Sequence, residues 1–406
     1  MPEAELRIER LSMLGEGVAH LDGRTVFVEG ALPGERVCAE VSEHGKVLRG
    51  ELLDILEQSP ARRAPACPLA ASCGGCDWLH ADERLQREAK EEIVLSALEH
   101  LAGISRQRVE RLPTVVSPRS MAYRRRAVLH VQGKTLGFFG KKSHAHVDVP
   151  ACPALTEPLS MLPGRLGPLV AAMAKDLESV TLIAEGTQVS LALHLSGPVK
   201  ARHLELTESA VRALKLSGAV LVPKTASPRL VKSPVLRSTS PLSPKVPMYS
   251  RPDAFVQANA EANVALVTSA VVALGAKEHD RVLELYCGQG NFTFAIAGTA
   301  ASVLAVESSG VSLELARRSA QEGRVDNVRF VQGEAAKVVK GLFAEGARFD
   351  LLLADPPRAG APGLSHWARM LGARRVVYVA CDPAALARDA RELRVAGFRP
   401  HTLQIV

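Results

Sequence analysis

Three of the chain's seven cysteines lie within ten residues, in the segment PACPLAASCGGCDWLH. Five residues separate Cys67 from Cys73 and two separate Cys73 from Cys76, while Cys152 follows later in VPACPAL. Four thiolates suit either structural zinc or a [4Fe–4S] cluster. Zinc sites more often use two CxxC pairs, and only one is present, so the spacing favours iron–sulfur. The spacing is not the CxxxCxxC of radical enzymes, which predicts a structural cluster.

Another cysteine, Cys381, stands where an expected strand gives way to an expected helix, in VVYVACDPAALARDA. The positive end of that helix favours a thiolate, and thiolates attack electron-poor carbon. We therefore expect Cys381 to be a nucleophile. Cys38 alternates with Val37 and Val41 and is expected to be an inert thiol in a strand core, and Cys287 is expected to be structural.

Asp355 follows a second apolar stretch, in LLLADPPRAG. The two prolines after it hold the loop extended and stiff. A stiff polar loop at this point can clamp the edge of a flat substrate. The alternative is a simple helix cap, which Pro356 and Pro357 disfavour because such a pair does not begin an ordinary helix well.

The segment ELYCGQGNF predicts a strand followed by a glycine turn at Gly288 and Gly290, where backbone can press against a cofactor. It lacks the third glycine of the dinucleotide fingerprint. Glu307 ends the next expected strand, where a carboxylate can accept hydrogen bonds from ribose hydroxyls. Together these features fit S-adenosylmethionine at least as well as a nucleotide.

These residues lie on strands that alternate with helices from about residue 263 onward, which predicts an α/β fold with a doubly wound parallel sheet and its ligands at the strands' carboxyl ends. Residues 6–56 read instead as several short strands with turns, typical of a small OB-like barrel. We predict three domains: a β-barrel at 1–58, a mixed α+β domain at 59–250, and an α/β domain at 251–406. The Ser- and Pro-rich segment 223–247 is expected to be a loop or linker.

Composition sets the broad class. The hydrophobic fraction is 47% and the net charge is +7, which favours a globular protein with an anionic partner. No acidic residue lies between Glu208 and Asp253, a stretch with eight lysines and arginines that could follow a phosphate backbone or could be an ordinary solvated loop. The charged start is unlike a signal peptide and the cysteine number is odd, so we expect a cytoplasmic protein with reduced thiols.

With these motifs assembled, the chain resembles the RNA uracil-5-methyltransferase family, in particular its 23S rRNA branch with a TRAM domain and an iron–sulfur cluster. GEGVAHLDGRTVFVEGALPGE is similar to the TRAM domain, and the Cys67, Cys73, Cys76 and Cys152 spacing matches the cluster pattern. DAFVQAN resembles the FxQxN signature, and ELYCGQGNFT, DPPRAG and YVACDP match the cofactor, substrate and nucleophile motifs of a Rossmann-like class I methyltransferase domain.

The resemblance implies methylation of uracil C5 in RNA through a covalent bond from Cys381 to C6 of a flipped base. It implies that Asp355 orients the uracil or the methyl donor. It also implies S-adenosylmethionine and a [4Fe–4S] cluster as cofactors, RNA as the partner, and no membrane or obligate protein partner. The residues that it assigns to S-adenosylmethionine are Gln257, Tyr286, Gly288, Gly290, Glu307 and Asp355.

Three departures from the family pattern qualify this expectation. Ala380 and Asp382 stand where the family usually has Ser and Asn, and the barrel region is net acidic. The chain ends at HTLQIV, so we expect it to lack the family's last strand and the glutamate base of its DxFPxTxHVE-like segment. The alternatives are a non-catalytic or truncated RNA-binding homologue, a tRNA uracil-5-methyltransferase, and a cytosine or protein methyltransferase with a zinc module.

Overall fold

The computed structural model describes residues 3–45 and 47–406 and separates into two compact units. The first unit comprises Met1–Arg106 with Gly140–Lys142, and the second comprises Gln107–Phe139 with Ser143–Val406. Within the described ranges, no helix is both long enough and apolar enough to cross a membrane. The three-domain division made from the sequence stays a prediction.

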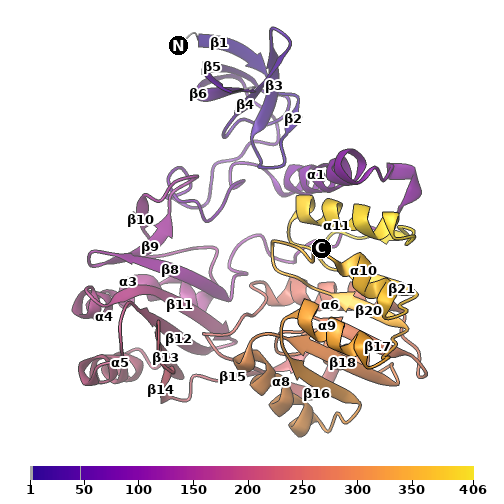
Figure 1. The fold of residues 1–406 in the computed structure, drawn as a ribbon. Helices are drawn as coiled ribbons and strands as arrows, with labels where there is room; N and C mark the ends of the chain where they lie inside the picture. The colour runs from indigo at the N-terminus through magenta and orange to yellow at the C-terminus, as the bar shows by residue number, and fades with distance from the viewer. Residues whose placement is uncertain (1–2, 46) are drawn as a thin grey trace. The chain divides into compact units, whose positions relative to one another are not determined.

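The first unit begins with a six-stranded barrel, as the strand pattern predicts (Figure 1). The sheet order is β1-β5-β6-β4-β3-β2. Its two edge strands, β1 and β2, follow one another in the chain and pair with β5 and β3, so the short connection between them brings the opposite edges of the curved sheet together. The strands span Glu3–Arg7 (β1), Arg10–Leu11 (β2), Gly17–Leu21 (β3), Arg24–Val28 (β4), Arg36–His44 (β5) and Val47–Glu57 (β6).

The expectation for Cys38 is wrong. Along β5, Val37, Ala39 and Val41 are buried in the barrel core, whereas Cys38 belongs to the alternate, half-buried face. Successive side chains of a strand point to opposite faces, so a residue between two core side chains cannot share their core.

The cysteine segment connects the barrel to a long helix. Helix α1 (Glu83–Ala102) begins at the Asp82 cap, whose side chain accepts a hydrogen bond from the Leu85 N–H, and ends at Gly103 in the left-handed conformation. The segment also pairs with the short insertion Gly140–Lys142, because Cys73 forms an isolated β-bridge with Gly140.

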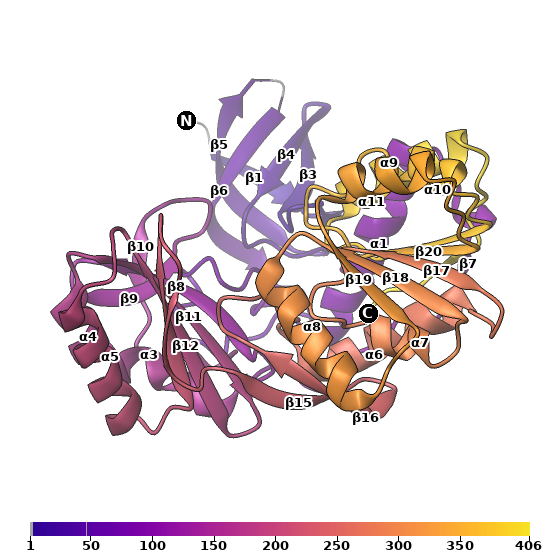
Figure 2. The ribbon, with the colours of Figure 1, turned by 60° about the horizontal axis from the view of Figure 1, so that its bottom comes forward.

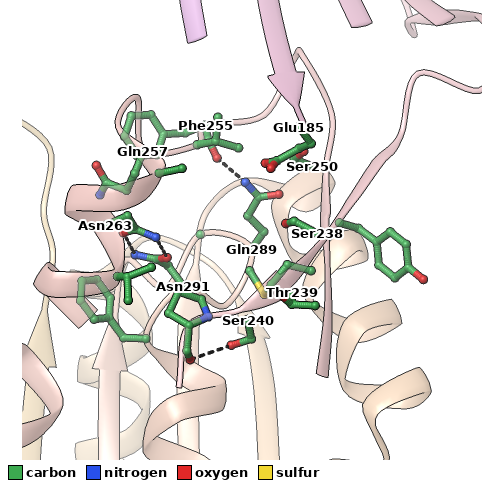
Figure 3. Close-up of a pocket in the computed structure, with 18 of the residues that line it drawn as sticks. Glu185, Ser238, Thr239, Ser240, Ser250, Phe255, Gln257, Asn263, Gln289 and Asn291 are labelled. Atoms are coloured by element: carbon green, nitrogen blue, oxygen red, sulfur yellow. Dashed lines mark hydrogen bonds between the residues drawn. The ribbon is translucent and has the colours of Figure 1, made fainter. Parts of the chain in front are cut away.

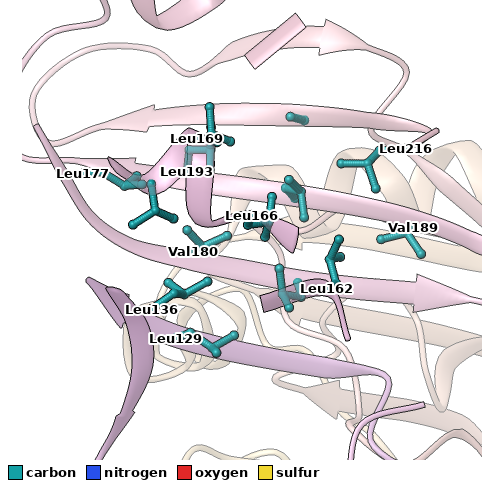
Figure 4. Packing of buried hydrophobic residues seen from close by; sticks show 14 of the residues in the cluster. Leu129, Leu136, Leu162, Leu166, Leu169, Leu177, Val180, Val189, Leu193 and Leu216 are labelled. Atoms are coloured by element: carbon teal, nitrogen blue, oxygen red, sulfur yellow. The ribbon is translucent and has the colours of Figure 1, made fainter. Parts of the chain in front are cut away.

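In the second unit, a seven-stranded sheet forms one core in the order β10-β9-β8-β11-β12-β13-β14. Helices α2 to α5 supply leucines and valines that pack on it, including Leu162 and Leu169, together with Leu166 between α3 and α4 (Figure 4). The strands are Arg126–Gln132 (β8), Thr135–Phe139 (β9), His146–Asp148 (β10), Leu177–Glu185 (β11), Gln188–Leu195 (β12), Gly218–Pro223 (β13) and Arg229–Lys232 (β14). The helices are Glu157–Ser160 (α2), Leu162–Arg165 (α3), Gly167–Met173 (α4) and Ala201–Ala213 (α5).

The prediction of a loop or linker at 223–247 is also wrong. This segment contains strand β14 and much of a hairpin made by β15 (Leu236–Ser240) and β16 (Ser243–Ser250). The hairpin is two-stranded, so Pro247 can sit at an edge without breaking a ladder on both sides. Figure 2 shows β16 beside helix α8 (Gly310–Gly323), where Val246 and Met248 share an apolar cluster with Ala320.

The remaining core is a five-stranded parallel sheet in the order β19-β18-β17-β20-β21, which confirms the α/β prediction. The strands are Arg281–Leu285 (β17), Ser302–Glu307 (β18), Val328–Gln332 (β19), Leu351–Ala354 (β20) and Arg375–Tyr378 (β21). Apolar clusters cover both faces. The helices besides α8 are Ala260–Leu274 (α6), Thr293–Ala297 (α7), Ala335–Ala344 (α9), Leu364–Met370 (α10) and Pro383–Val395 (α11).

The last strand predicted from the sequence, in FRPHTLQIV, forms only Thr402–Leu403 (β22). It pairs in parallel with Glu110–Arg111 (β7), which follows a short 3₁₀ turn at Arg106–Arg108 (η1). This pairing joins residues from the two ends of the second unit.

Candidate active site

The sheet order places the predicted site residues at a topological switch point. Strand β17 lies in the middle of the sheet. The next strand along the chain, β18, pairs with one side of β17, and β20 pairs with the other, so the strand order reverses at the carboxyl end of β17. The Cys287 N–H donates to the Val306 carbonyl at 3.0 Å, and the Asp355 N–H donates to the Leu285 carbonyl at 3.4 Å. The glycine turn and Asp355 therefore meet at one edge of the sheet.

The turn after β17 has an unusual backbone. Tyr286, Gly288 and Gly290 all adopt positive φ angles, of 64°, 56° and 91°. A positive φ at a non-glycine residue such as Tyr286 is uncommon and is found at ligand-binding turns. A Cβ on Gly288 would meet open space, whereas one on Gly290 would lie 2.5 Å from the Phe294 ring. Gly288 thus leaves room for a ligand, and Gly290 lets α7 pack closely.

Glu307 ends β18 as predicted, and its carboxylate supports the turn. It accepts hydrogen bonds from the Gly288 N–H at 3.0 Å and the Ser309 N–H at 2.8 Å. The Glu307 carboxylate therefore fixes the turn after β17 relative to the end of β18. Its oxygens can still accept a hydrogen bond from a ligand.

A cavity of about 340 Å³ opens beside this turn, entirely within the second unit (Figure 3). Of the residues predicted to bind the cofactor, Gln257, Tyr286, Gly288 and Asp355 line it. The Gln257 Nε2 donates to Asp355 Oδ2 at 3.4 Å, so the two side chains are coupled across the cavity wall. Glu307 and Gly290 do not line the cavity.

Two carboxyl groups near the turn are held away from water. Burial raises the pKa of Asp355 to about 7. Burial, with the carboxylates of Asp355 and Glu307 nearby, raises the pKa of Glu284 to about 8. Glu284 is fully buried, and its neighbouring polar side chain is the Thr293 hydroxyl, which lies close to it without making a hydrogen bond of ordinary geometry. Such perturbed groups are typical of functional sites.

Cys381 is exposed at the carboxyl end of the strand next to β20, as the sequence predicts. The next residue, Asp382, is the N-cap of α11 and accepts a hydrogen bond from the Ala385 N–H at 2.8 Å. Its carboxylate thus occupies the positive helix end that the sequence assigned to the thiol. Cys381 lies outside the cavity that Asp355 lines.

The four predicted metal ligands are divided between the units. Cys67, Cys73 and Cys76 belong to the first and Cys152 to the second, and all four side chains are half-buried. In residues 3–45 and 47–406, no group of three or more His, Cys, Asp or Glu side chains is arranged to hold a metal ion. The metal site stays a prediction, for which the thiol donors are chemically suited.

Several lining residues were missed by the sequence reasoning. Asn263 and Asn291 exchange reciprocal side-chain hydrogen bonds of 2.7 and 2.9 Å, which tie α6 to the glycine turn (Figure 3). Arg125 donates from Nε to the Gln257 carbonyl at 2.9 Å and pairs with Glu185. These partners are separated by up to 132 positions, and no local pattern could reveal them.

Known proteins share these features. Residues 3–53 match the TRAM domain, and residues 229–399 match the family described as tRNA (Uracil-5-)-methyltransferase. The chain is 34% identical to the 23S rRNA (uracil(1939)-C(5))-methyltransferase RlmD of Alkalilimnicola ehrlichii, over 96% of this chain and 89% of that protein. It is also 34% identical to the RlmD of Pseudomonas putida, over 97% and 88%.

The chain belongs to the RNA uracil-5-methyltransferase family. Its N-terminal barrel is a TRAM domain, and its parallel sheet is the class I methyltransferase fold. A crystal structure of the Pyrococcus abyssi tRNA (uracil-54, C5)-methyltransferase with S-adenosyl-L-homocysteine has the same overall fold, with a TM-score of 0.69, 22% identity, and coverage of 96% of this chain and 93% of that one. This uracil-5-methyltransferase therefore uses S-adenosylmethionine to methylate C5 of uracil in RNA.

The cavity has features that suit such a cofactor. Gly288 lines it with open backbone at the carboxyl end of β17, the edge at which a doubly wound sheet binds ligands. Two buried polar atoms without a partner, Gln289 Oε1 and Ser250 Oγ, also belong to lining residues, and such atoms suit a polar ligand.

Proposed function

We propose that this enzyme methylates a uridine of 23S ribosomal RNA and that Cys381 is its nucleophile. The rRNA substrate is supported by the relatives that match nearly the whole chain, which are named 23S rRNA (uracil(1939)-C(5))-methyltransferases. The observation that carries the nucleophile is the exposed thiol three residues after β21, beside the strand that Asp355 follows.

Uracil C5 is a weak nucleophile, and covalent addition solves this problem. The Cys381 thiolate adds to C6, which places the electron pair on C5 and the O4 carbonyl as an enolate. S-adenosylmethionine, when bound, supplies the methyl group that C5 takes up. A base then removes the C5 proton, and the returning electron pair expels the thiolate. The target base must leave its stack to reach Cys381.

Asp355 is proposed to orient the reacting groups. Because its pKa is about 7, it can present either a hydrogen-bond donor or an acceptor near neutral pH. Its bond to Gln257 fixes the direction in which the carboxyl group points. The proposed cofactor ligands are Gln257, Tyr286, Gly288, Gly290, Glu307 and Asp355, and Gly290 acts through the packing of the turn.

We also propose that Cys67, Cys73, Cys76 and Cys152 hold a [4Fe–4S] cluster with a structural role. Thiolate donors and a single CxxC pair support this assignment. The β-bridge from Cys73 to Gly140 supports it too, because it joins the cysteine segment to the chain that continues toward Cys152. When bound, such a cluster would cross-link the segments that carry its cysteines and would take no part in methyl transfer.

RNA is proposed to contact the basic stretch through its exposed members. Arg229 and Lys232 are exposed on β14, the edge strand of the seven-stranded sheet. Arg251, by contrast, is buried and paired with Asp253, so it cannot follow a phosphate backbone. The basic stretch is therefore only in part a surface for RNA.

The decisive experiment uses 5-fluorouridine-substituted 23S rRNA and tRNA transcripts. Fluorine at C5 prevents proton removal, so a covalent adduct accumulates. Wild-type protein and the Cys38→Ala control should form an adduct with the rRNA, and Cys381→Ala should form none. Transfer of labelled methyl groups is measured in parallel on unmodified transcripts. Full methyl transfer by Cys381→Ala would disprove the nucleophile, and a preference for tRNA would disprove the rRNA substrate.

A further inference from the structure

One end of the cavity is lined by residues from three separate parts of the second unit. Glu185 ends β11, Ser250 ends β16, and Gln289 lies in the glycine turn after β17. Figure 3 shows the Gln289 side chain rising from the turn toward Phe255, Glu185 and Ser250.

Two buried oxygens at this end have no partner. Gln289 is 7% exposed and Ser250 is 5% exposed, and neither Gln289 Oε1 nor Ser250 Oγ makes a hydrogen bond in the protein. The Gln289 amide is not free to turn, because its Nε2 donates to the Phe255 carbonyl at 2.6 Å. Its oxygen is thereby presented as a fixed acceptor.

Glu185 adds a further acceptor. One of its oxygens accepts a hydrogen bond from Arg125 Nη1, which leaves the other for a second donor. Arg125 also donates to the Gln257 carbonyl, so the Arg125–Glu185 pair is held in place against the FxQxN segment. Three oxygens therefore lie at one end of the cavity, and hydrogen bonds from neighbouring groups hold the side chains of two of them, Glu185 and Gln289.

Buried polar groups without partners are rare in folded proteins because leaving them unpaired costs their desolvation. Two such groups in one cavity are explained by a ligand that supplies the missing donors. We propose that Glu185, Ser250 and Gln289 form a subsite for a ligand group that donates hydrogen bonds, an amine or a hydroxyl. This inference rests on the proposed function, which supplies two sources of such a group.

The sources are the amino-acid end of S-adenosylmethionine and an exocyclic amine of a nucleotide next to the target uracil. The test variant is Ser250→Ala. Since Ser250 Oγ has no partner in the protein, its loss should leave the melting temperature unchanged. Ser190→Ala is the matched control, because Ser190 Oγ is likewise buried and unpartnered but lies outside the cavity. Gln289→Met removes the second acceptor at nearly constant volume.

Binding of S-adenosyl-L-homocysteine is measured by calorimetry, and binding of an rRNA transcript by fluorescence anisotropy. A five- to tenfold weaker affinity for S-adenosyl-L-homocysteine in Ser250→Ala and Gln289→Met, with Ser190→Ala unchanged, assigns the subsite to the cofactor. The same loss confined to RNA assigns it to the nucleotide. If both variants bind both ligands within twofold of the wild type, the proposal is overturned. Wild-type protein that binds S-adenosyl-L-homocysteine but methylates no RNA would refute the proposed function and leave the cofactor measurement valid.

Discussion

Tyr378 donates its phenolic hydrogen to Asp389, with 2.6 Å between Oη and Oδ2. The same carboxyl oxygen accepts the Ala361 N–H at 2.7 Å. Tyr378 ends β21, three residues before Cys381, whereas Ala361 belongs to the loop that follows Asp355. One buried carboxylate on α11 therefore holds together the two loops that carry the proposed catalytic residues.

Asp389→Ala should destabilise the second unit. Asp389 is 1% exposed, and its removal leaves the Tyr378 hydroxyl and the Ala361 N–H without their acceptor. We expect a loss of about 2–4 kcal/mol in the free energy of unfolding, and about 1 kcal/mol for Tyr378→Phe, which removes one bond and leaves the carboxylate paired. Urea unfolding followed by Trp367 fluorescence in a Trp78→Phe background measures both. Equal stabilities of Asp389→Ala and the wild type would contradict this account.

Glu284→Gln should change how stability depends on pH. The pKa of Glu284 is about 8 in the folded chain and near 4.5 when unfolded. Between these values the unfolded chain has lost the proton and the folded chain keeps it, so wild-type stability falls as pH rises from 4.5 to 8. The amide that replaces this carboxyl group cannot ionise, so we expect the Glu284→Gln variant to be more stable than the wild type at pH 8 by roughly 1–3 kcal/mol.

Thermal melting of the Glu284→Gln variant and the wild type between pH 5 and 8 tests this expectation. The exposed Glu345→Gln is the control and should follow the wild type across the range. A wild-type curve parallel to that of Glu284→Gln would show that Glu284 does not hold its proton in the folded chain.

Glu307→Ala should weaken cofactor binding. Its carboxylate accepts hydrogen bonds from the N–H groups of Gly288 and Ser309, so its loss frees the turn as well as removing an acceptor for ribose. We expect S-adenosyl-L-homocysteine to bind about ten- to hundredfold more weakly in calorimetry. Glu307→Gln keeps one acceptor oxygen, so its affinity for S-adenosyl-L-homocysteine should lie between those of the wild type and Glu307→Ala. If both variants bind as tightly as the wild type, Glu307 does not belong to the cofactor site.

Replacing Arg229 and Lys232 by Gln should weaken RNA binding without changing cofactor binding. Each phosphate that no longer meets a cationic side chain lowers the salt slope of single-stranded RNA binding by about 0.7, so the double variant should lower it by about 1.4. Anisotropy titrations over a range of salt concentrations measure the slope. Lys337→Gln, on α9 and outside the basic stretch, is the control. An unchanged slope in the double variant would place the RNA elsewhere.

Cys73→Ser should lose bound iron and soluble folding before any specific effect on chemistry. A cluster held by four thiolates links segments far apart in the sequence, so the loss of one ligand removes a cross-link. Iron, zinc and sulfide analysis of the purified protein is the measurement, with Cys38→Ser as the control. Zinc without iron in the wild type would show that the four cysteines bind zinc and not a cluster. A soluble, iron-free and fully active Cys73→Ser would show that the cluster has no structural role.

The amino-acid sequence by itself determined the elements and the order of the motifs. Alternating apolar strands and helices predicted the parallel sheet, and the residues directly after its strands, including Gly288, Asp355 and Cys381, were located because parallel strands carry their carboxyl ends to one edge. Strand alternation was misread at Cys38, and the Ser and Pro content of 223–247 concealed a hairpin that packs on α8.

Only the tertiary structure decided which of these residues act together. The Gln257–Asp355 bond, the Tyr378–Asp389 bond and the shared cavity of Glu185, Ser250 and Gln289 join segments separated by many positions or built on different sheets. Burial, which raises the pKa of Glu284 and Asp355, is likewise a property of the packed core. Local sequence fixes where a side chain leaves its own strand or helix, but its partners and its distance from water depend on how those elements pack.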